Sequence, residues 1–267
     1  MNDDFGDRMK RYEGRESDRT FMPFLPTLAR LDGRSFHTFC RGLEKPYDEN
    51  FHSLMVEVTR FLMQEAVPLA GYTQSDEISL VWTSTAESQA FFNGRAQKMT
   101  SILAALASVE FNRLLPQYLP KKAHLRPVFD CRVWQVPTRE EAANTFLWRE
   151  NDASRNSVLA AGQAVFSHKE LQGLGTKKVQ EKLFQERNIN WNDYPAWAKR
   201  GSWFRRRWQS RPFTTEDLEK LPPKHHARTN PHLFVGGTTV VREDMPRFGS
   251  VNNRAAVIFD AADPETT

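Results

Sequence analysis

The order of secondary-structure elements expected in the first 137 residues constrains the fold more than any other feature of this sequence. Short apolar runs bounded by turn residues predict strands, and apolar residues at helical spacing predict helices. The expected order is strand, helix, strand, strand, helix, strand, over residues 27–31, 48–66, 71–73, 78–82, 87–115 and 128–136. This is the split arrangement of a ferredoxin-like α+β domain, in which the first strand lies beside the hairpin of the next two.

Individual residues support the ends of these elements. Gly33 stops the first strand, and Asp48 is a suitable N-cap for the helix that Pro68 terminates. Pro137 ends the last strand. We therefore expect residues 1–137 to form one catalytic domain built on this sheet.

Carboxylates stand at the ends of two neighbouring strands in this arrangement. Asp32 follows the first strand, and Asp76 and Glu77 lie in the turn of the hairpin. Two carboxylates in one site raise each other's pKa unless a cation lies between them. Hard oxygen ligands suit Mg²⁺, which takes one or two carboxylates and completes its shell with water and phosphates. The pattern predicts a metal site that handles phosphates.

Each half of this pattern also has a simpler interpretation. Asp32 before Gly33 is a common turn pair, and an acidic pair at a hairpin tip can be merely solvated. The expected topology favours the metal site because it brings the two halves to the same edge. Backbone N–H groups after Asp32 are also able to cradle phosphate. A soft-metal pair of His37 and Cys40 is disfavoured because no further ligand has matching spacing.

Composition sets wider limits. The chain has 267 residues, of which 26% are charged and 39% hydrophobic, as in an ordinary globular protein. The pI of about 9.1 leans toward a polyanionic partner. Cys40 and Cys131 are the only cysteines, which fits a reducing compartment. The N-terminus has no apolar signal core, and the longest apolar stretch, residues 102–107, is too short to cross a membrane. We expect a cytoplasmic protein without a membrane partner.

The region 138–267 is expected to be mainly helical and to pack as one unit with the first domain. Helical spacing covers residues 140–148, 153–166 and 177–185. Residues 199–211 contain six basic residues, three aromatic residues and no acid. Such a segment suits RNA, and its alternative is a strand whose arginines face water. His225, His226 and His232 lie in a Pro-rich stretch, residues 221–231 and beyond, that reads as a solvated loop and not as a zinc site.

A series of motifs resembles the tRNA(His) guanylyltransferase family and its close relatives. The motifs run in chain order from about residue 25 to about residue 210, and they are Arg30-Leu31-Asp32-Gly33-Arg34-Ser35-Phe36-His37, Glu44-Lys45-Pro46-Tyr47-Asp48, Ser75-Asp76-Glu77, Phe129-Asp130-Cys131-Arg132-Val133, Trp148-Arg149 and Asn188-Ile189-Asn190. The resemblance implies an α/β sandwich with a polymerase-like palm, extended by helices and a β-hairpin. It also implies a nucleotidyltransferase that adds nucleotides to the 5′ end of RNA, as a 3′-to-5′ polymerase. The family further implies a homo-tetramer or dimer.

The resemblance assigns roles to particular residues. Asp32, Asp76 and Glu77 would be catalytic, and two Mg²⁺ ions would be held by Asp32, Asp76 and the Gly33 carbonyl. The nucleotide, GTP with ATP or another triphosphate as further candidates, would be bound by Gly33, Arg34, Ser35, Phe36, His37, Lys45, Asp48 and Ser75. A second triphosphate, equivalent to the activated RNA end, would be bound by Arg30, Arg95 and Lys98. RNA would be contacted by Lys199, Arg200, Arg205, Arg206 and Arg207.

One motif departs from the eukaryotic members of the family. They have His-Ile-Asn-Asn where this chain has Ser154-Arg155-Asn156-Ser157, a version similar to the bacterial branch. The histidine supports activation of a 5′-monophosphate by ATP, so its absence puts that step in doubt. Members of the bacterial branch often repair 5′-truncated tRNA, so the expected substrates are tRNA(His) or truncated tRNA.

Two other function classes stay open from the sequence. A catalytically silent RNA-binding protein could share the palm, although clustered carboxylates would repel its ligand. A nucleotidyl cyclase would share the metal carboxylates, but it does not explain Trp148-Arg149 or Asn188-Ile189-Asn190.

Overall fold

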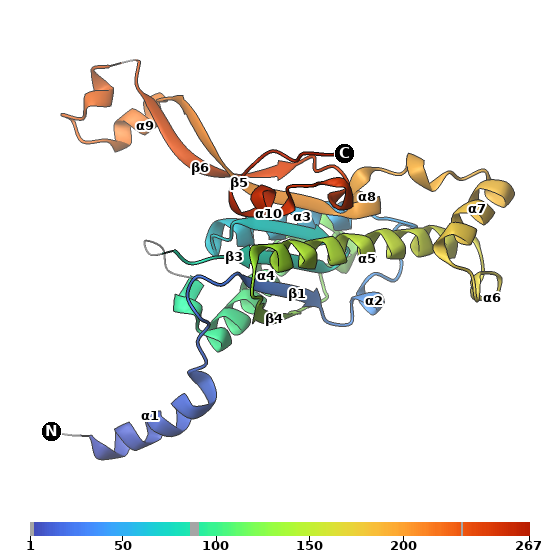
Figure 1. Ribbon diagram of the computed structural model, residues 1–267, viewed down its shortest axis with the longest axis horizontal. Coiled ribbons are helices and arrows are strands. Elements are labelled where there is room, and N and C mark those ends of the chain that lie inside the picture. The colour runs from blue at the N-terminus through green and yellow to red at the C-terminus, as the bar shows by residue number, and fades with distance from the viewer. Residues whose placement is uncertain (1–2, 86–90, 231) are drawn as a thin grey trace.

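A single antiparallel sheet of six strands organises the molecule (Figure 1). The computed structural model describes residues 3–85, 91–230 and 232–267. The strand order is β4-β1-β3-β2-β5-β6. The strands are β1 (Thr27–Gly33), β2 (Ala70–Gln74), β3 (Glu77–Trp82), β4 (Phe129–Gln135), β5 (Ser202–Pro212) and β6 (Phe234–Glu243).

The first four strands and two helices have the predicted order. Helix α3 (Glu49–Glu65) connects β1 to β2, and α4 (Ala96–Tyr118) connects β3 to β4. The Asp48 side chain caps α3 by accepting a hydrogen bond from the Phe51 N–H, as expected. The α+β, ferredoxin-like prediction is thus confirmed.

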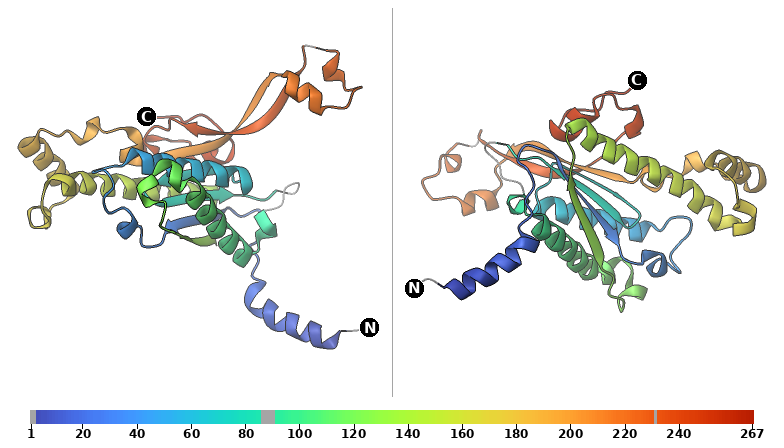
Figure 2. Two further views of the ribbon diagram at one scale, coloured as in Figure 1. Left: turned by 180° about the vertical axis from the view of Figure 1, so that it is seen from behind. Right: turned by 60° about the horizontal axis from the view of Figure 1, so that its bottom comes forward.

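The two faces of the sheet have separate cores. Helices α3 and α4 bury one face, around Leu31, Ile78 and Phe111. The other face packs against α5 (Arg139–Val165) and α10 (Arg254–Phe259), around Leu28, Tyr72 and other residues. Helices therefore cover both faces, as Figure 2 shows.

Several segments extend from this body. Beyond the sheet, β5 and β6 continue as a two-stranded ribbon that carries α9 (Thr215–Lys220) near its tip (Figure 1). Helix α1 (Asp4–Ser17) projects from the same end of the molecule, below the ribbon in Figure 1, and α7 (Thr176–Arg187) packs on the distal half of α5. The remaining helices are α2 (Phe36–Phe39), α6 (His168–Leu171) and α8 (Ala196–Arg200), with short 3-10 turns at Phe91–Gly94, Pro120–Lys122, Trp191–Asp193, His226–Arg228 and Phe248–Ser250.

Two helix predictions were wrong in their bounds. The helix expected over residues 87–115 begins at Ala96, because Phe92, Asn93 and Gly94 have positive φ angles; residues 87–90 lie outside the described residues. The two helices expected over 140–148 and 153–166 are the single helix α5. The intervening residues include no proline or glycine, and Asp152 joins Arg149 and Arg155 one turn away on either side.

No helix in the described parts of the chain has both the length and the apolar character needed to cross a membrane. The division of the chain at residue 137 stays a prediction. Strand β5 pairs with β2, so the sheet is continuous across that boundary.

Candidate nucleotide and metal site

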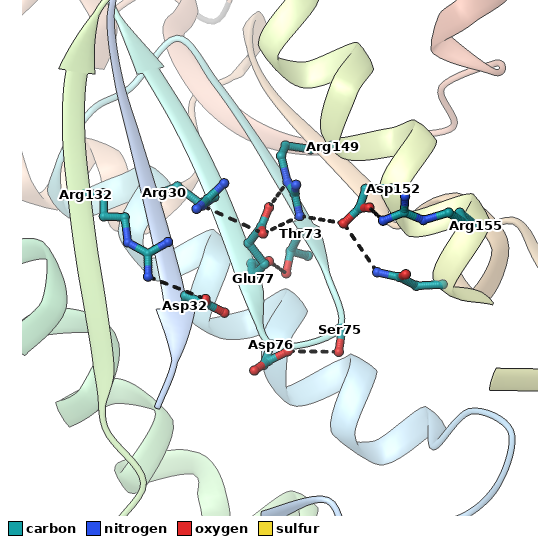
Figure 3. Close-up of polar contacts among 11 residues, drawn as sticks. Arg30, Asp32, Thr73, Ser75, Asp76, Glu77, Arg132, Arg149, Asp152 and Arg155 are labelled. Carbon is teal, nitrogen blue, oxygen red and sulfur yellow. Dashed lines mark hydrogen bonds and ion pairs between the residues drawn. The ribbon is translucent and has the colours of Figure 1, made fainter. Parts of the chain in front are cut away.

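The strand register brings the predicted carboxylates to one edge of the sheet. Asp32 lies opposite Glu77 on β3 and opposite Asp130 on β4. The Gly33 N–H donates a hydrogen bond of 3.2 Å to the Asp76 carbonyl oxygen, which ties the end of β1 to the hairpin turn. Figure 3 shows Asp32 and Asp76 at this edge, where both strands end.

Asp76 is poorly stabilised as an anion. Burial, with smaller contributions from the nearby Asp32 and Glu77 carboxylates, raises its pKa to about 6, although the Ser75 hydroxyl donates a hydrogen bond of 3.0 Å that lowers it. A divalent cation beside the carboxylate would favour its charged form. Within the described ranges no group of three or more His, Cys, Asp or Glu side chains is placed to hold a metal. The pair of Asp32 and Asp76 nevertheless fits Mg²⁺, since that ion needs only one or two carboxylates.

Glu77 does not complete this acidic pair. Its carboxylate accepts two hydrogen bonds of 2.6 Å from the Arg149 guanidinium, and Arg30 Nε lies 3.9 Å from Glu77 Oε2 (Figure 3). Both members of the Glu77–Arg149 pair are buried. The catalytic role of Glu77 stays a prediction; in the structure its carboxylate binds Arg149.

The predicted loop after β1 is only partly available to a ligand. The Phe36 ring is 2% exposed and packs against Phe39, Phe111 and Phe129, so this side chain cannot hold a nucleotide. Arg34, Ser35 and His37 are exposed. Ser35 has a left-handed φ of 58°. Such a backbone turn aims successive N–H groups outward, as in anion-binding nests.

A pocket of about 310 Å³ lies next to the acidic edge. Three of the predicted nucleotide-binding residues, Lys45, Asp48 and Ser75, line it. Asp48 is partly committed, because its carboxylate accepts hydrogen bonds from the Glu44 and Phe51 N–H groups. The Ser75 hydroxyl links the pocket to Asp76. The pocket is therefore continuous with the site proposed for the metal.

Helix α5 and α8 supply the opposite wall, which the sequence did not assign. The wall includes Ala153, Asn156, Ser157 and Trp197, and Tyr47 from the loop before α3 also lines the pocket. The Tyr47 hydroxyl donates to the Ser157 carbonyl oxygen at 2.8 Å, and the Trp197 ring stacks on His52 at 4.3 Å. Asn156 and Ser157 belong to the motif that differs from the eukaryotic members of the family, Ser154-Arg155-Asn156-Ser157. That motif was the sequence signal by which these two residues could have been found. Ser154 is not among the described residues that line the pocket.

Arg95 and Lys98 are not brought to the carboxylates within this chain. The Ser108 hydroxyl accepts from the Phe129 N–H, and Phe129 pairs with Gly33, so this turn of α4 lies near the acidic edge. Arg95 precedes Ser108 by 13 residues of helix, or about 20 Å. These two residues therefore lie far from the carboxylates of the same subunit, and their role in a second triphosphate site stays a prediction. Arg30 does lie near the edge, since it precedes Asp32 by two residues on β1.

The basic segment does not present all its arginines to a ligand. The alternative of a strand is confirmed for Ser202–Pro212. Arg205 is 2% exposed, and its guanidinium donates to the Val257 and Ala262 carbonyl oxygens. Arg207 forms ion pairs with Glu243 and Asp263. The prediction that Arg205 contacts RNA is wrong, and Arg207 is engaged within the protein.

Lys199, Arg200 and Arg206 are partly exposed. Arg206 donates to the Met63 carbonyl oxygen, and Lys199 donates to that of Asn192. Contact of these three residues with RNA stays a prediction.

The sequence is similar to those of known proteins. Residues 6–137 match the family model described as tRNAHis guanylyltransferase. The tRNA(His) guanylyltransferase of Saccharomyces cerevisiae is 29% identical over 206 residues, covering 70% of this chain and 85% of the relative.

Solved structures of similar proteins lead to the same family. A bacterial tRNA(His) guanylyltransferase (Thg1)-like protein in complex with ATP has a TM-score of 0.71 and 38% identity, covering 76% of this chain and 87% of that one. A second such bacterial structure, in complex with GTP, has a TM-score of 0.70 and 29% identity, covering 92% and 94%. The chain therefore belongs to the tRNA(His) guanylyltransferase family of nucleotidyltransferases.

Proposed function

We propose that this protein adds nucleotides to the 5′ end of tRNA in the 3′-to-5′ direction, with Mg²⁺ as its cofactor. One observation carries the proposal: the Asp32–Asp76 pair adjoins a pocket that Lys45 and Ser75 line. A phosphate chain could extend from the metal edge while the base and ribose occupy the pocket. Bacterial relatives with GTP or ATP bound support this assignment.

The proposed metal ligands are Asp32, Asp76 and the Gly33 carbonyl, for two Mg²⁺ ions. Such ions, when bound, polarise phosphoryl oxygens and neutralise charge on the leaving group. The chain itself contributes orientation. The backbone N–H groups of the turn at residues 35–37 and the Lys45 ammonium are suited to bind the triphosphate, and the Ser75 hydroxyl fixes the Asp76 carboxylate.

In the proposed reaction, the 3′-hydroxyl of the bound nucleoside triphosphate attacks the α-phosphate of a triphosphorylated RNA 5′ end. A P–O bond forms, pyrophosphate leaves the RNA, and the hydroxyl proton passes to solvent. The product keeps the triphosphate of the incoming nucleotide, so a further addition is possible.

The substrate proposal follows the sequence at the altered motif. Because Ser154 stands in place of the family histidine, we propose that RNA ends already carrying a triphosphate are preferred to 5′-monophosphates. Guanylylation of tRNA(His) and templated repair of truncated tRNA are both compatible with the site. A cytoplasmic location and a homo-tetramer or dimer stay predictions.

The test compares tRNA(His) with several 5′-truncated tRNAs, each carrying a 5′-monophosphate or a 5′-triphosphate. Purified protein with Mg²⁺ and nucleoside triphosphates should lengthen at least one triphosphorylated RNA by one or more nucleotides. Asp76→Ala and chelator should each abolish the extension, while Glu57→Gln on the outer part of α3 serves as the matched control. RNA binding without extension of any RNA would contradict the proposal, as would a cyclic product from GTP alone.

A further inference from the structure

Trp148 is an exposed aromatic side chain beside the acidic edge. Its side chain is 53% exposed, although its neighbours Phe146 and Arg149 on α5 are buried. A tryptophan that served only the core would have its ring covered by apolar side chains. The packing of α5 therefore does not account for the position of this ring.

The ring lies over a polar part of the sheet. The Arg30 guanidinium carbon is 5.5 Å from the Trp148 ring centroid. Arg30 lies opposite Arg132 in the register of β1 and β4. The Arg132 guanidinium lies 4.0 Å from the Asp32 carboxylate. Side chains two residues apart on a strand share one face, so Arg30 and Asp32 point to the same side.

Charged groups hold the ring in place. The Arg149 guanidinium carbon is 4.5 Å from the ring centroid, and Glu77 binds Arg149 through two hydrogen bonds. Cations over an aromatic face are attracted by its quadrupole. Beside these two guanidinium groups the residue remains 53% exposed. The result is a fixed ring with surface left for a ligand.

The surroundings indicate the chemistry of that ligand. Arg30 lies over the ring, and Arg132 lies opposite Arg30 on the neighbouring strand β4. Both guanidinium groups are suited to a phosphate, while the ring is suited to a base. Asp32 is two residues, or about 7 Å along the strand, from Arg30. An RNA end that reacts at Asp32 and Asp76 would thus place its terminal base near Trp148.

We propose that Trp148 is the stacking platform for the terminal base of the RNA whose 5′ end is extended, with Arg30 and Arg132 beside its backbone. This inference rests on the proposed function and assigns a positioning residue for the RNA substrate. Glu77 and Arg149 act through Trp148 by fixing its ring. The role explains why the chain buries a Glu–Arg pair beside the metal edge without using Glu77 as a metal ligand.

The experiment uses the full-length protein and a triphosphorylated RNA with 2-aminopurine as its 5′-terminal base. Stacking on an aromatic side chain quenches the fluorescence of this base, so the measurement needs no turnover and is made without added nucleotides. Binding to the native protein and to Trp148→Phe should quench the probe, whereas binding to Trp148→Ala at saturating protein should not. Phe184→Ala removes a 59% exposed aromatic side chain on α7, away from the segment predicted to contact RNA, and is the matched control.

Kinetics supply a second readout. Stacking of one base contributes about 1–3 kcal/mol, so the KM for RNA should rise about 5- to 150-fold in Trp148→Ala. The KM for the nucleoside triphosphate should be unchanged, and Trp148→Phe should recover most of the RNA affinity. Melting curves of both variants exclude loss of folding as the cause.

Three results would overturn the inference: no quenching by the native protein, equal quenching by Trp148→Ala, or a change of oligomeric state in that variant with an unchanged KM for RNA. The last would assign the ring to a contact with another protein chain. Failure of the proposed function is distinguishable, since it would appear as no extension by the native protein.

Discussion

Replacing Asp76 by asparagine should stabilise the metal-free protein while abolishing nucleotide transfer. The pKa of about 6, against the ordinary value of 3.8, corresponds to about 3 kcal/mol that opposes the charged form in the folded state. The Asp76 side chain is partly exposed, so solvent screening reduces this to about 1–3 kcal/mol. Asparagine keeps an oxygen for the Ser75 hydroxyl but carries no charge.

The sign of the pH dependence follows from the raised pKa. The folded protein binds this proton more tightly than the unfolded chain, so the free energy of unfolding falls as the pH rises from about 4 to about 6. Above that range the penalty is fully present, and below it the native and Asp76→Asn proteins should differ little.

The assay is urea unfolding in EDTA at pH 7 and at pH 4. Asp76→Asn should be more stable than the native protein at pH 7 only, and added Mg²⁺ should stabilise the native protein but not the variant. Asp130→Asn is the control, since that carboxylate is 52% exposed at the same sheet edge. Equal or lower stability of Asp76→Asn at pH 7 would refute the claim that the carboxylate is poorly stabilised without a cation.

Three further predictions concern the supports of the site. Arg149→Ala should cost about 3–5 kcal/mol of unfolding free energy, because it removes both hydrogen bonds to the buried Glu77 and leaves it only the more distant Arg30, and Glu77→Gln combined with Arg149→Met should recover much of that loss in urea unfolding. Gly33→Ala places a Cβ 2.3 Å from the Phe36 ring and should cost about 1–3 kcal/mol, whereas Gly175→Ala, which meets nothing within 4 Å, should change the melting temperature little. Arg205→Met should alter thermal stability but leave the salt dependence of RNA binding unchanged, since the guanidinium is buried; a shallower salt slope would restore Arg205 as an RNA contact.

Sequence periodicity was sufficient for the central sheet because each element there is governed by local rules. Asp48 caps α3 from its own side chain, and short apolar runs bounded by turn residues identify β1 and β3, which are largely buried. The meeting of Asp32 and Asp76 then follows from topology alone.

The errors arose where tertiary contacts override local pattern. Glu77 and Arg149 are 72 residues apart, and nothing in either segment indicates that they pair. Arg205 belongs to a run of arginines that reads as exposed, but the C-terminal carbonyl groups and Glu243 bury it. Polar residues around Asp152 interrupt the apolar pattern of α5, so two helices were predicted where there is one. Asp152 pairs with Arg149 and Arg155 while the backbone stays helical.

The origin of the released pyrophosphate tests the central claim most directly. A truncated tRNA would carry a label in the γ-phosphate of its 5′-triphosphate, and the incoming nucleotide would carry a different label in its own γ-phosphate. The account predicts that the RNA label leaves in pyrophosphate and that the label of the incoming nucleotide stays at the new 5′ end. Pyrophosphate that carries the label of the incoming nucleotide would contradict 3′-to-5′ addition at Asp32 and Asp76.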